Sequence, residues 1–381
     1  MVELVSIPSV NPSGIEPDGR VTGEGRLAQF VALKLEQFGA RVKVEEVLPG
    51  RPNVVAEVGL EEGRTLLFET HLDTVPPEGE AGFTPRRKDE FLLGRGACDA
   101  KGAFCAMMLA LRALTKVLPL PGRVILAAVA DEEHSFKGVQ RLIESGLKAD
   151  GAVVGEPTRM KVVVGHKGTL RFKVVARGRA VHSSEPQRGE NAIEKMAKFI
   201  CEFAPRLRRK AESHIHPKVG GATVNIGVIR GGTRANVVPA YCEVEVERRV
   251  VPLESFDEVW EEVLRVAEEA SRAAGVGVEV LPPHVRDPWL LTDEREPLVL
   301  SASRALGSLG LDGRPDYVAY STDASKLSSA GTPNIVLGPG DPKLAHSAEE
   351  GVLINEVALA TEAYVRLALE FLGGSREALG R

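Results

Sequence analysis

The stretch Leu67-Phe-Glu-Thr-His-Leu-Asp-Thr-Val-Pro76 joins an apolar run to side chains that can bind a metal ion. The apolar residues 65–68 predict a buried strand, and His71 and Asp73 follow at its carboxyl end. Open α/β sheets place their functional sites at the carboxyl ends of strands. A single histidine is more often structural, but an aspartate two residues later can fix the imidazole tautomer and raise its basicity. This stretch therefore predicts an α/β sheet with a candidate metal ligand at its edge.

Further segments of the chain repeat this arrangement of apolar residues followed by metal-capable side chains. They contribute Asp99 among three glycines, the adjacent pair Glu132 and Glu133 after the apolar run 123–130, Glu156 after 152–154, and His346 after 336–337. If one of the two adjacent glutamates serves in catalysis and Asp73 orients His71, two histidines and three carboxylates remain. Such a set suits two zinc-like ions that share one bridging carboxylate.

Two of these segments also allow simpler interpretations. Gly94-Arg-Gly-Ala-Cys-Asp99 resembles a dinucleotide-binding loop, but it lacks the third glycine, and an acid would stand where the pyrophosphate lies. The acids 131–133 could form a solvated loop, because three adjacent carboxylates repel one another. Cations at the carboxyl end of the strand would remove that repulsion. The concentration of all these residues at strand ends of one domain favours a metal site.

The order of the predicted elements indicates two domains. Strands and helices alternate over residues 24–154 and again after residue 296, and the strands are continuous apolar runs, which is typical of a mixed, largely parallel sheet covered on both faces. Residues 166–283 instead predict strand, helix, strand, strand, helix, strand, the order of an α+β, ferredoxin-like module. We therefore expect a catalytic α/β domain over 1–165 and 284–381, interrupted by an inserted α+β domain over 166–283.

The composition is that of a globular enzyme. Hydrophobic residues make up 43% and charged residues 27% of the 381 positions. A net charge of −5 does not favour binding to nucleic acid or to an anionic membrane, and the longest apolar runs are far too short to span a bilayer. The four cysteines form no CxxC pair, and the start of the chain has no secretory pattern, so we expect a cytoplasmic protein with reduced thiols.

Together these motifs resemble the acetylornithine deacetylase and succinyl-diaminopimelate desuccinylase family, which are dinuclear zinc amidohydrolases related to aminoacylases and glutamate carboxypeptidases. The similarity covers essentially the whole chain. The matching segments are His71-Leu-Asp-Thr-Val-Pro76, Gly94-Arg-Gly-Ala-Cys-Asp99, Asp131-Glu-Glu133, Gly155-Glu-Pro-Thr158, Gly178 with His182-Ser183, Asn236-Val-Val-Pro239, Ser321-Thr-Asp323, and Gly338-Pro-Gly340 followed by His346.

The resemblance implies a zinc-peptidase-like catalytic domain and a role for each matching residue. Asp99 would bridge two divalent ions, which would be Zn²⁺ or Co²⁺. His71 and Glu156 would complete one metal site, and Glu133 and His346 the other. Glu132 would be the general base and Asp73 would orient His71. The inserted domain would act as a lid and join two chains in a homodimer, with His182 reaching the partner's active site to stabilise the oxyanion and Asn236 nearby.

The substrate is constrained less by the sequence. The family acts on molecules with a free carboxylate, so Arg248 is a candidate partner for that group, and the backbone at Gly338 and Gly340 could offer further donors. We expect cleavage of an N-acyl amino acid, by deacetylation of a basic amino acid or by desuccinylation. A metallo-carboxypeptidase or dipeptidase acting on short peptides is the alternative within the class. An inactive metal-binding interaction protein is the alternative from another class, and the presence of Glu132 argues against it.

Overall fold

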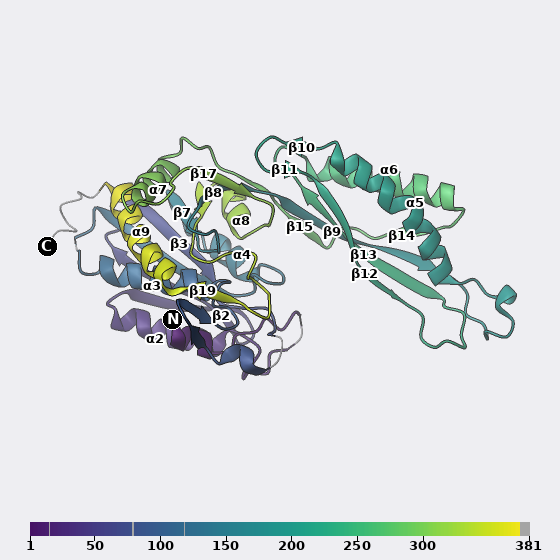
Figure 1. Ribbon diagram of the computed structural model, residues 1–381, viewed down its shortest axis with the longest axis horizontal. Coiled ribbons are helices and arrows are strands. Elements are labelled where there is room, and N and C mark those ends of the chain that lie inside the picture. The colour runs from purple at the N-terminus through teal and green to yellow at the C-terminus, as the bar shows by residue number, and fades with distance from the viewer. Residues whose placement is uncertain (15, 78–79, 118, 374–381) are drawn as a thin grey trace. The chain divides into compact units, whose positions relative to one another are not determined.

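The computed structural model describes residues 1–14, 16–77, 80–117 and 119–373 of the chain. The chain divides into two compact units. Unit 1 comprises Met1–Val164, Thr292–Asp316 and Thr322–Arg381, and unit 2 comprises Gly165–Leu291 with the short segment Tyr317–Ser321. Figure 1 shows the two units as an α/β body and a smaller body of long strands and two helices.

Most of the main sheet belongs to unit 1. Within the described residues it has nine strands, in the order β1-β2-β6-β3-β7-β18-β8-β16, with β17 also pairing β8. Their bounds are β1 Arg41–Leu48, β2 Arg51–Gly59, β3 Arg64–His71, β6 Gly122–Val129, β7 Gly151–Val154, β8 Val162–His166, β16 Leu290–Leu291, β17 Pro315–Val318 and β18 Asn334–Val336. The central strands β6, β3, β7 and β18 are parallel, and antiparallel pairs flank them. The predicted mixed, largely parallel sheet is therefore confirmed.

The central strands are buried because helices pack over them. All residues of β3 after Arg64 are buried, as are all four of β7, the pattern expected of strands covered on both faces. On this sheet α3 packs with α7 and α9, α4 packs with α8, and α2 packs on β1 and β2 (Figure 1). Their bounds are α3 Lys101–Leu114, α4 Lys137–Glu144, α7 Pro297–Gly307, α8 Ala324–Ser329 and α9 Ile354–Leu372, while α1 (Val2–Ser6) and α2 (Gly25–Gln37) precede the sheet.

The register of the parallel strands explains where the site forms. His71, the last residue of β3, lies opposite Val129, the last residue of β6. Val154, the last residue of β7, lies opposite Glu69 of β3 and Val336 of β18. The segments that follow these four strands therefore leave the sheet at the same edge. A small sheet of β4 (Arg86–Lys88), β5 (Phe91–Leu93) and β19 (Gly351–Leu353) and a 3₁₀ helix, η1 (Glu80–Phe83), complete unit 1.

Unit 2 is built on a separate antiparallel sheet in the order β12-β13-β9-β14, with β15 also pairing β9. The strands are β9 Gly168–Arg177, β12 Thr223–Gly231, β13 Tyr241–Val250, β14 Glu279–Val280 and β15 Val285–Asp287. The helices are α5 Ala192–Glu212 and α6 Phe256–Ala274, with η2 Pro186–Arg188 and the hairpin β10 (Ile215–His216) and β11 (Gly220–Gly221) beside them. Alternate apolar residues of β9 and β13 pack on α5 and α6 in one core that includes Phe172, Phe199 and Phe203.

Candidate metal centre and active site

Asp99 lies at the centre of the site in unit 1, in the segment that precedes α3. Its Oδ1 is 3.0 Å from His71 Nε2, and its Oδ2 is 3.3 Å from His346 Nε2. The two oxygens of one carboxylate therefore face two different imidazoles. A carboxylate placed in this way could be shared between two metal ions.

Two groups of side chains could each hold a metal ion. One is His71, Asp99 and Glu156, and the other is Asp99, Glu133 and His346; within each group the ligand atoms lie within 4.8 Å of one another. The five side chains that were expected to bind metal are thus brought together from segments up to 275 residues apart in the chain, as the positions of His71 and His346 show (346 − 71). Glu132 is adjacent to Glu133 but belongs to neither group.

The electrostatics of the site also fit bound cations. Burial raises the pKa of Glu156 to about 7, and the charge of Asp99 adds to that rise against the opposing effect of His71. Burial likewise raises the pKa of Glu133 and, strongly, that of Glu132. Several carboxylates thus compete for two imidazoles in a poorly solvated space. Divalent cations would supply the missing positive charge, so the residues present fit a dinuclear metal site.

The surrounding carboxylates favour the protonated, positively charged form of both histidines. Hydrogen bonds to Asp99 and Glu133 raise the pKa of His346 to about 10. Burial lowers the pKa of His71, but the charge of Glu156 and the contacts with Asp73 and Asp99 outweigh it, so the pKa lies well above the usual value. Burial also acts on Asp99, yet the hydrogen bonds from both imidazoles keep its pKa below the usual range.

Asp73 contacts both His71 and the two glutamates that follow β6. The closest partner of His71 Nδ1 is the backbone carbonyl of Asp73, at 2.9 Å, while the carboxylate Oδ1 is 3.6 Å away. The Asp73 carboxylate instead accepts the backbone N–H groups of Glu132, at 3.1 Å, and of Glu133, at 3.0 Å. It therefore ties the end of β3 to the two glutamates that follow β6.

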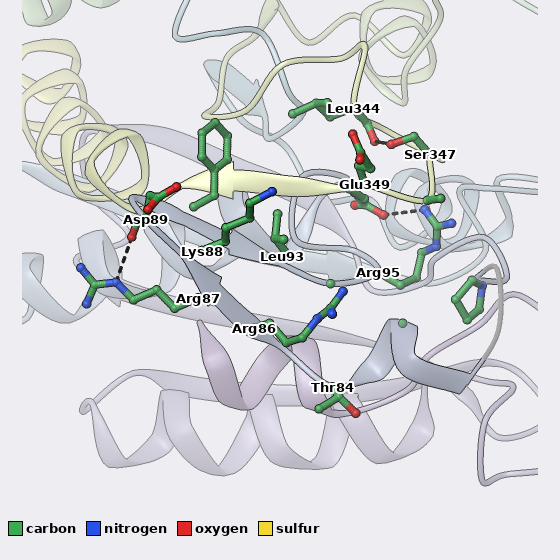
Figure 2. A pocket seen from close by; sticks show the side chains of 16 residues that line it. Thr84, Arg86, Arg87, Lys88, Asp89, Leu93, Arg95, Leu344, Ser347 and Glu349 are labelled. Carbon is green, nitrogen blue, oxygen red and sulfur yellow. Dashed lines mark hydrogen bonds and ion pairs between the residues drawn. The ribbon is translucent and has the colours of Figure 1, made fainter.

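Glu350 braces the Asp99 segment from the other side. Its Oε1 accepts the backbone N–H groups of Cys98 and Asp99, both at 3.0 Å, and its Oε2 accepts from Arg95 at 2.5 Å. This Arg95–Glu350 pair forms part of the wall of a cavity of about 740 Å³ (Figure 2), which the exposed strand β4 also lines. None of the five candidate ligands lines this cavity, so it lies beside the metal groups without containing them.

In unit 2, two motifs that are distant in sequence lie side by side. His182 forms an isolated β-bridge with Val237, and the backbone N–H of Ser183 donates to the carbonyl of Asn236 at 3.1 Å. The exposed His182 ring has its Nδ1 2.7 Å from Ser184 Oγ. The structure therefore brings His182 and Asn236 together within this unit, and their participation in catalysis stays a prediction.

Arg248 does not have the free guanidinium that binding of a substrate carboxylate requires. Its side chain is fully buried, and its two terminal nitrogens donate to the carboxylate of Glu254 at 3.0 and 2.6 Å. One of them also donates to the carbonyl of Arg249. These contacts argue against the role expected for Arg248, since the turn after β13 already supplies its anionic partner.

The backbone at Gly338 and Gly340 is also engaged within the protein. The Gly338 N–H donates to Thr158 Oγ1 at 3.1 Å, and the Gly340 N–H donates to Glu356 at 2.9 Å. A Cβ at Gly338 would lie 2.5 Å from the carbonyl oxygen of Glu156. These contacts argue against the expected substrate-binding role of both glycines and give Gly338 a packing role beside a candidate ligand.

Several buried polar residues lie beneath the site, and among them only Asp131, in the Asp131-Glu-Glu133 motif, is marked by a local sequence pattern. Glu24, Arg51 and Asp131 form one ion-pair network, and Asn11 contacts both Asp73 and Asp131. Glu69 lies within β3, and neither of its carboxylate oxygens has a hydrogen-bond partner within the described residues. In the sequence the others are visible only as polar side chains within apolar runs or near helix starts. Polar residues at such positions commonly have a structural role, so they did not indicate a site.

Comparison with known proteins places the chain in a family of hydrolases. Residues 67–370 match the sequence model of peptidase family M20/M25/M40. The chain is 31% identical to an acetylornithine deacetylase of Myxococcus xanthus over 362 residues, which cover 91% of this chain and 92% of the relative. It is 32% identical to an acetylornithine deacetylase of Edwardsiella ictaluri over 361 residues, covering 91% and 90%.

Solved structures share the fold at lower sequence identity. A tripeptidase from Staphylococcus aureus superposes with a TM-score of 0.79 and 22% identity over 98% of this chain and 96% of its own. A metallo-carboxypeptidase from Sulfolobus solfataricus gives 0.77 and 19% over 97% and 98%.

The fold and the paired ligand groups define a metal-dependent hydrolase. More specifically, the chain belongs to peptidase family M20/M25/M40, which confirms the resemblance stated from its motifs. Among the described residues, no helix has the length and apolar character needed to cross a membrane.

Proposed function

We propose that this chain is a two-metal amidohydrolase that removes the acyl group from an N-acyl amino acid. The observation that carries the proposal is the position of Asp99, whose two oxygens face His71 and His346, with Glu132 beside one ligand group but outside it. N-acetyl basic amino acids are the preferred substrates, because relatives about 30% identical over most of the chain are named acetylornithine deacetylase. N-succinyl amino acids are the next choice.

Two divalent ions, Zn²⁺ or Co²⁺, would be held by His71, Asp99, Glu133, Glu156 and His346. Such ions supply Lewis acidity at the amide carbonyl and lower the pKa of water. Glu132 then acts as general base: its carboxylate takes a proton from the attacking water and delivers it to the leaving amine. Burial raises the pKa of Glu132, so its carboxylate binds a proton more strongly than that of an exposed glutamate.

Unit 2 would serve as a lid and as the surface that joins two chains. β12 is an edge strand of its sheet, and Ile229 on it is 57% exposed. An exposed apolar edge strand is a ready template for pairing with a second copy. His182 of one chain would then donate a hydrogen bond to the oxyanion in the active site of the other, with Asn236 beside it.

A peptidase acting on dipeptides or tripeptides is the second candidate. The description of the matching family favours it, since amide hydrolysis at the same metals would cleave a peptide. The deciding experiment is a panel assay of purified protein with zinc or cobalt against N-acetylornithine, N-acetyl-lysine, N-succinyl-diaminopimelate and several dipeptides. Fastest turnover of an N-acetyl basic amino acid supports the proposal, fastest turnover of dipeptides supports the alternative, and no turnover of any of them contradicts both.

A further inference from the structure

A buried polar network lies directly beneath the acidic loop, which we define as Asp131, Glu132 and Glu133. Three consecutive backbone N–H groups of this loop donate to carboxylates from elsewhere in unit 1. Asp131 donates to Glu24 at 3.1 Å, Glu132 to Asp73 at 3.1 Å, and Glu133 to Asp73 at 3.0 Å. Asp131 has a φ of 70°, a left-handed conformation that residues other than glycine seldom adopt. The path of the loop is thus set by its partners.

Asn11 connects the two acids that hold this loop. Its side-chain Nδ2 donates to Asp73 Oδ2 at 2.7 Å and to Asp131 Oδ1 at 3.0 Å. Asn11 is 4% exposed, and both aspartates are fully buried. Its own backbone N–H donates to the carbonyl of Thr74 at 2.9 Å, which fixes the residue beside Asp73. One neutral amide group therefore satisfies two buried anions at once.

Arg51 supports the same acid from the opposite side. Its guanidinium forms two bonds of 2.6 Å to Glu24 and lies 2.9 Å from Asp131 Oδ1. Arg51 is 3% exposed and Glu24 is fully buried. Asp131 Oδ1 is thus shared between Arg51 and Asn11, so the network compensates the charge of Asp131 without using either side chain of Glu132 or Glu133.

We propose that Asn11 is a positioning residue. Through its contacts with Asp73 and Asp131, it holds the acidic loop so that Glu132 and Glu133 lie at the correct distance from the other residues of the metal groups. The proposal rests on the function proposed above, in which Glu132 is the general base and Glu133 a metal ligand. Asp73 accepts the N–H groups of both glutamates, so a displacement of Asp73 moves base and ligand together. Displacements of about 1 Å can cost roughly 100-fold in rate, and partners that orient metal ligands typically contribute about 10–100-fold.

The test is Asn11→Ala, with Asn334→Ala as the matched control. Asn334 is also fully buried, and its Nδ2 also donates two bonds, to the carbonyls of Ala324 and Thr332, both at 2.9 Å. It lies at the start of β18, and the acidic loop follows the carboxyl end of β6. We expect Asn11→Ala to lower kcat about 10–100-fold with KM within about twofold, and Asn334→Ala to leave kcat within about twofold while lowering thermal stability.

Two further variants and two measurements without substrate complete the design. Asn11→Asp is isosteric but places a third carboxylate between two others, so its loss should exceed that of Asn11→Ala, while Asn11→Ser keeps one donor and should lose less. Amide hydrogen exchange in the peptide that spans residues 130–136 should be faster in Asn11→Ala and unchanged in Asn334→Ala. Zinc titration should show weaker binding in Asn11→Ala.

The outcomes separate this inference from the proposed function. Unchanged kcat and unchanged exchange in Asn11→Ala would overturn it, as would an equal loss of kcat in Asn334→Ala, which would show a general effect of removing a buried amide. If the wild-type protein hydrolyses no substrate of the panel, the proposed function fails. Faster exchange and weaker zinc binding confined to Asn11→Ala would then still support the positioning role, and unchanged values would overturn it.

Discussion

At the scale of single residues, Glu132 and Glu133 are adjacent in the chain but make different contacts. Glu133 Oε1 lies 3.0 Å from His346 Nε2, whereas Glu132 belongs to neither ligand group. Glu132→Gln keeps the size of the side chain and removes its ability to accept a proton. We expect kcat to fall by roughly 10²–10⁴ with two metal ions retained, measured by steady-state kinetics and by metal analysis. Loss of metal in Glu132→Gln, or near-normal activity, would show that the two roles are reversed or misassigned.

The ion pair of Arg248 with Glu254 allows a test of whether Arg248 stabilises the fold or binds substrate. Breaking a buried ion pair by removing one partner costs about 3–5 kcal/mol, because the other charge stays buried and unpaired. Arg248→Met should therefore lower the free energy of unfolding on that scale, and Arg248→Met combined with Glu254→Gln should recover part of it. Chemical denaturation measures both. A large rise in KM with unchanged stability would instead restore Arg248 as a substrate ligand.

The pKa of His346 predicts how metal binding depends on pH. In the metal-free protein, hydrogen bonds to Asp99 and Glu133 raise this pKa from 6.5 to about 10. The stabilisation from these bonds is complete below the unfolded-state pKa and is lost as pH rises through about 10. A metal ion requires the neutral imidazole, so its binding releases a proton and strengthens as pH rises.

We therefore expect the rise in Tm produced by zinc to grow between pH 6 and pH 9, since the metal-free protein loses stability over the window in which metal affinity increases. Differential scanning calorimetry with and without zinc measures the rise in Tm at each pH. The control is Arg314→Ala, which breaks the ion pair of Arg314 with Asp312 and should leave the rise in Tm unchanged. A difference in Tm that is constant over this range would contradict the argument.

At the scale of elements, the site depends on how closely α4 approaches the end of β6. Gly138, in the first turn of α4, donates its backbone N–H to the carbonyl of Ala130 at 3.0 Å. A Cβ there would lie 2.2 Å from that oxygen and 2.5 Å from Ala130 N. Gly138→Ala should therefore destabilise the protein by about 1–3 kcal/mol. It should also lower activity, because a shift of Ala130 would displace the acidic loop, which begins at the next residue.

Gly307 offers the opposite result with the same substitution. It is the last residue of α7, and a Cβ built on it meets no atom within 4 Å. Gly307→Ala should stabilise the protein by about 0.4–1 kcal/mol, because alanine restricts the unfolded chain. Thermal unfolding of both variants measures the two effects, and a change of the same sign in both would show that the space around Gly138 does not decide its cost.

The elements also show which features could be predicted from the sequence. β6 and β7 are largely apolar runs, and β3 contains the apolar residues 66–68. The order and direction of these strands place His71, the acidic loop and Glu156 at one edge of the sheet. That inference needs only local patterns and the general behaviour of parallel strands. The contacts of Asn11 could not be predicted in this way, since its partners lie 62 and 120 residues away in the chain. The pairing of Arg248 with Glu254 could not be predicted either, because it depends on how the turn after β13 folds back.

At the scale of the whole molecule, the chemistry of the metal groups is incomplete without a donor for the oxyanion. His182 is the predicted donor, but it belongs to unit 2 and the ligands belong to unit 1. In the proposed dimer, unit 2 of one chain completes the active site of the other. An oxyanion donor contributes roughly 2.7–4 kcal/mol to transition-state stabilisation, so His182→Ala should lower kcat by about 100–1,000-fold while leaving metal content unchanged.

The assignment of His182 to the partner's site makes a sharper prediction. His182→Ala and Glu132→Gln are each expected to be nearly inactive as homodimers. A mixed dimer would hold one active site with both substitutions and one with neither, because each site takes Glu132 from one chain and His182 from the other.

Mixing the two variants should therefore restore activity up to about one quarter of the wild-type value, since random exchange gives half of all dimers mixed, with one intact site in each. Subunit exchange is verified with differently tagged chains. In the control, His182→Ala is replaced by His214→Ala, which changes a half-buried histidine of unit 2 that pairs with Glu254. Verified exchange without recovery would place His182 in its own chain's site or outside catalysis, and an active species that sedimentation shows to be monomeric would exclude the shared site altogether.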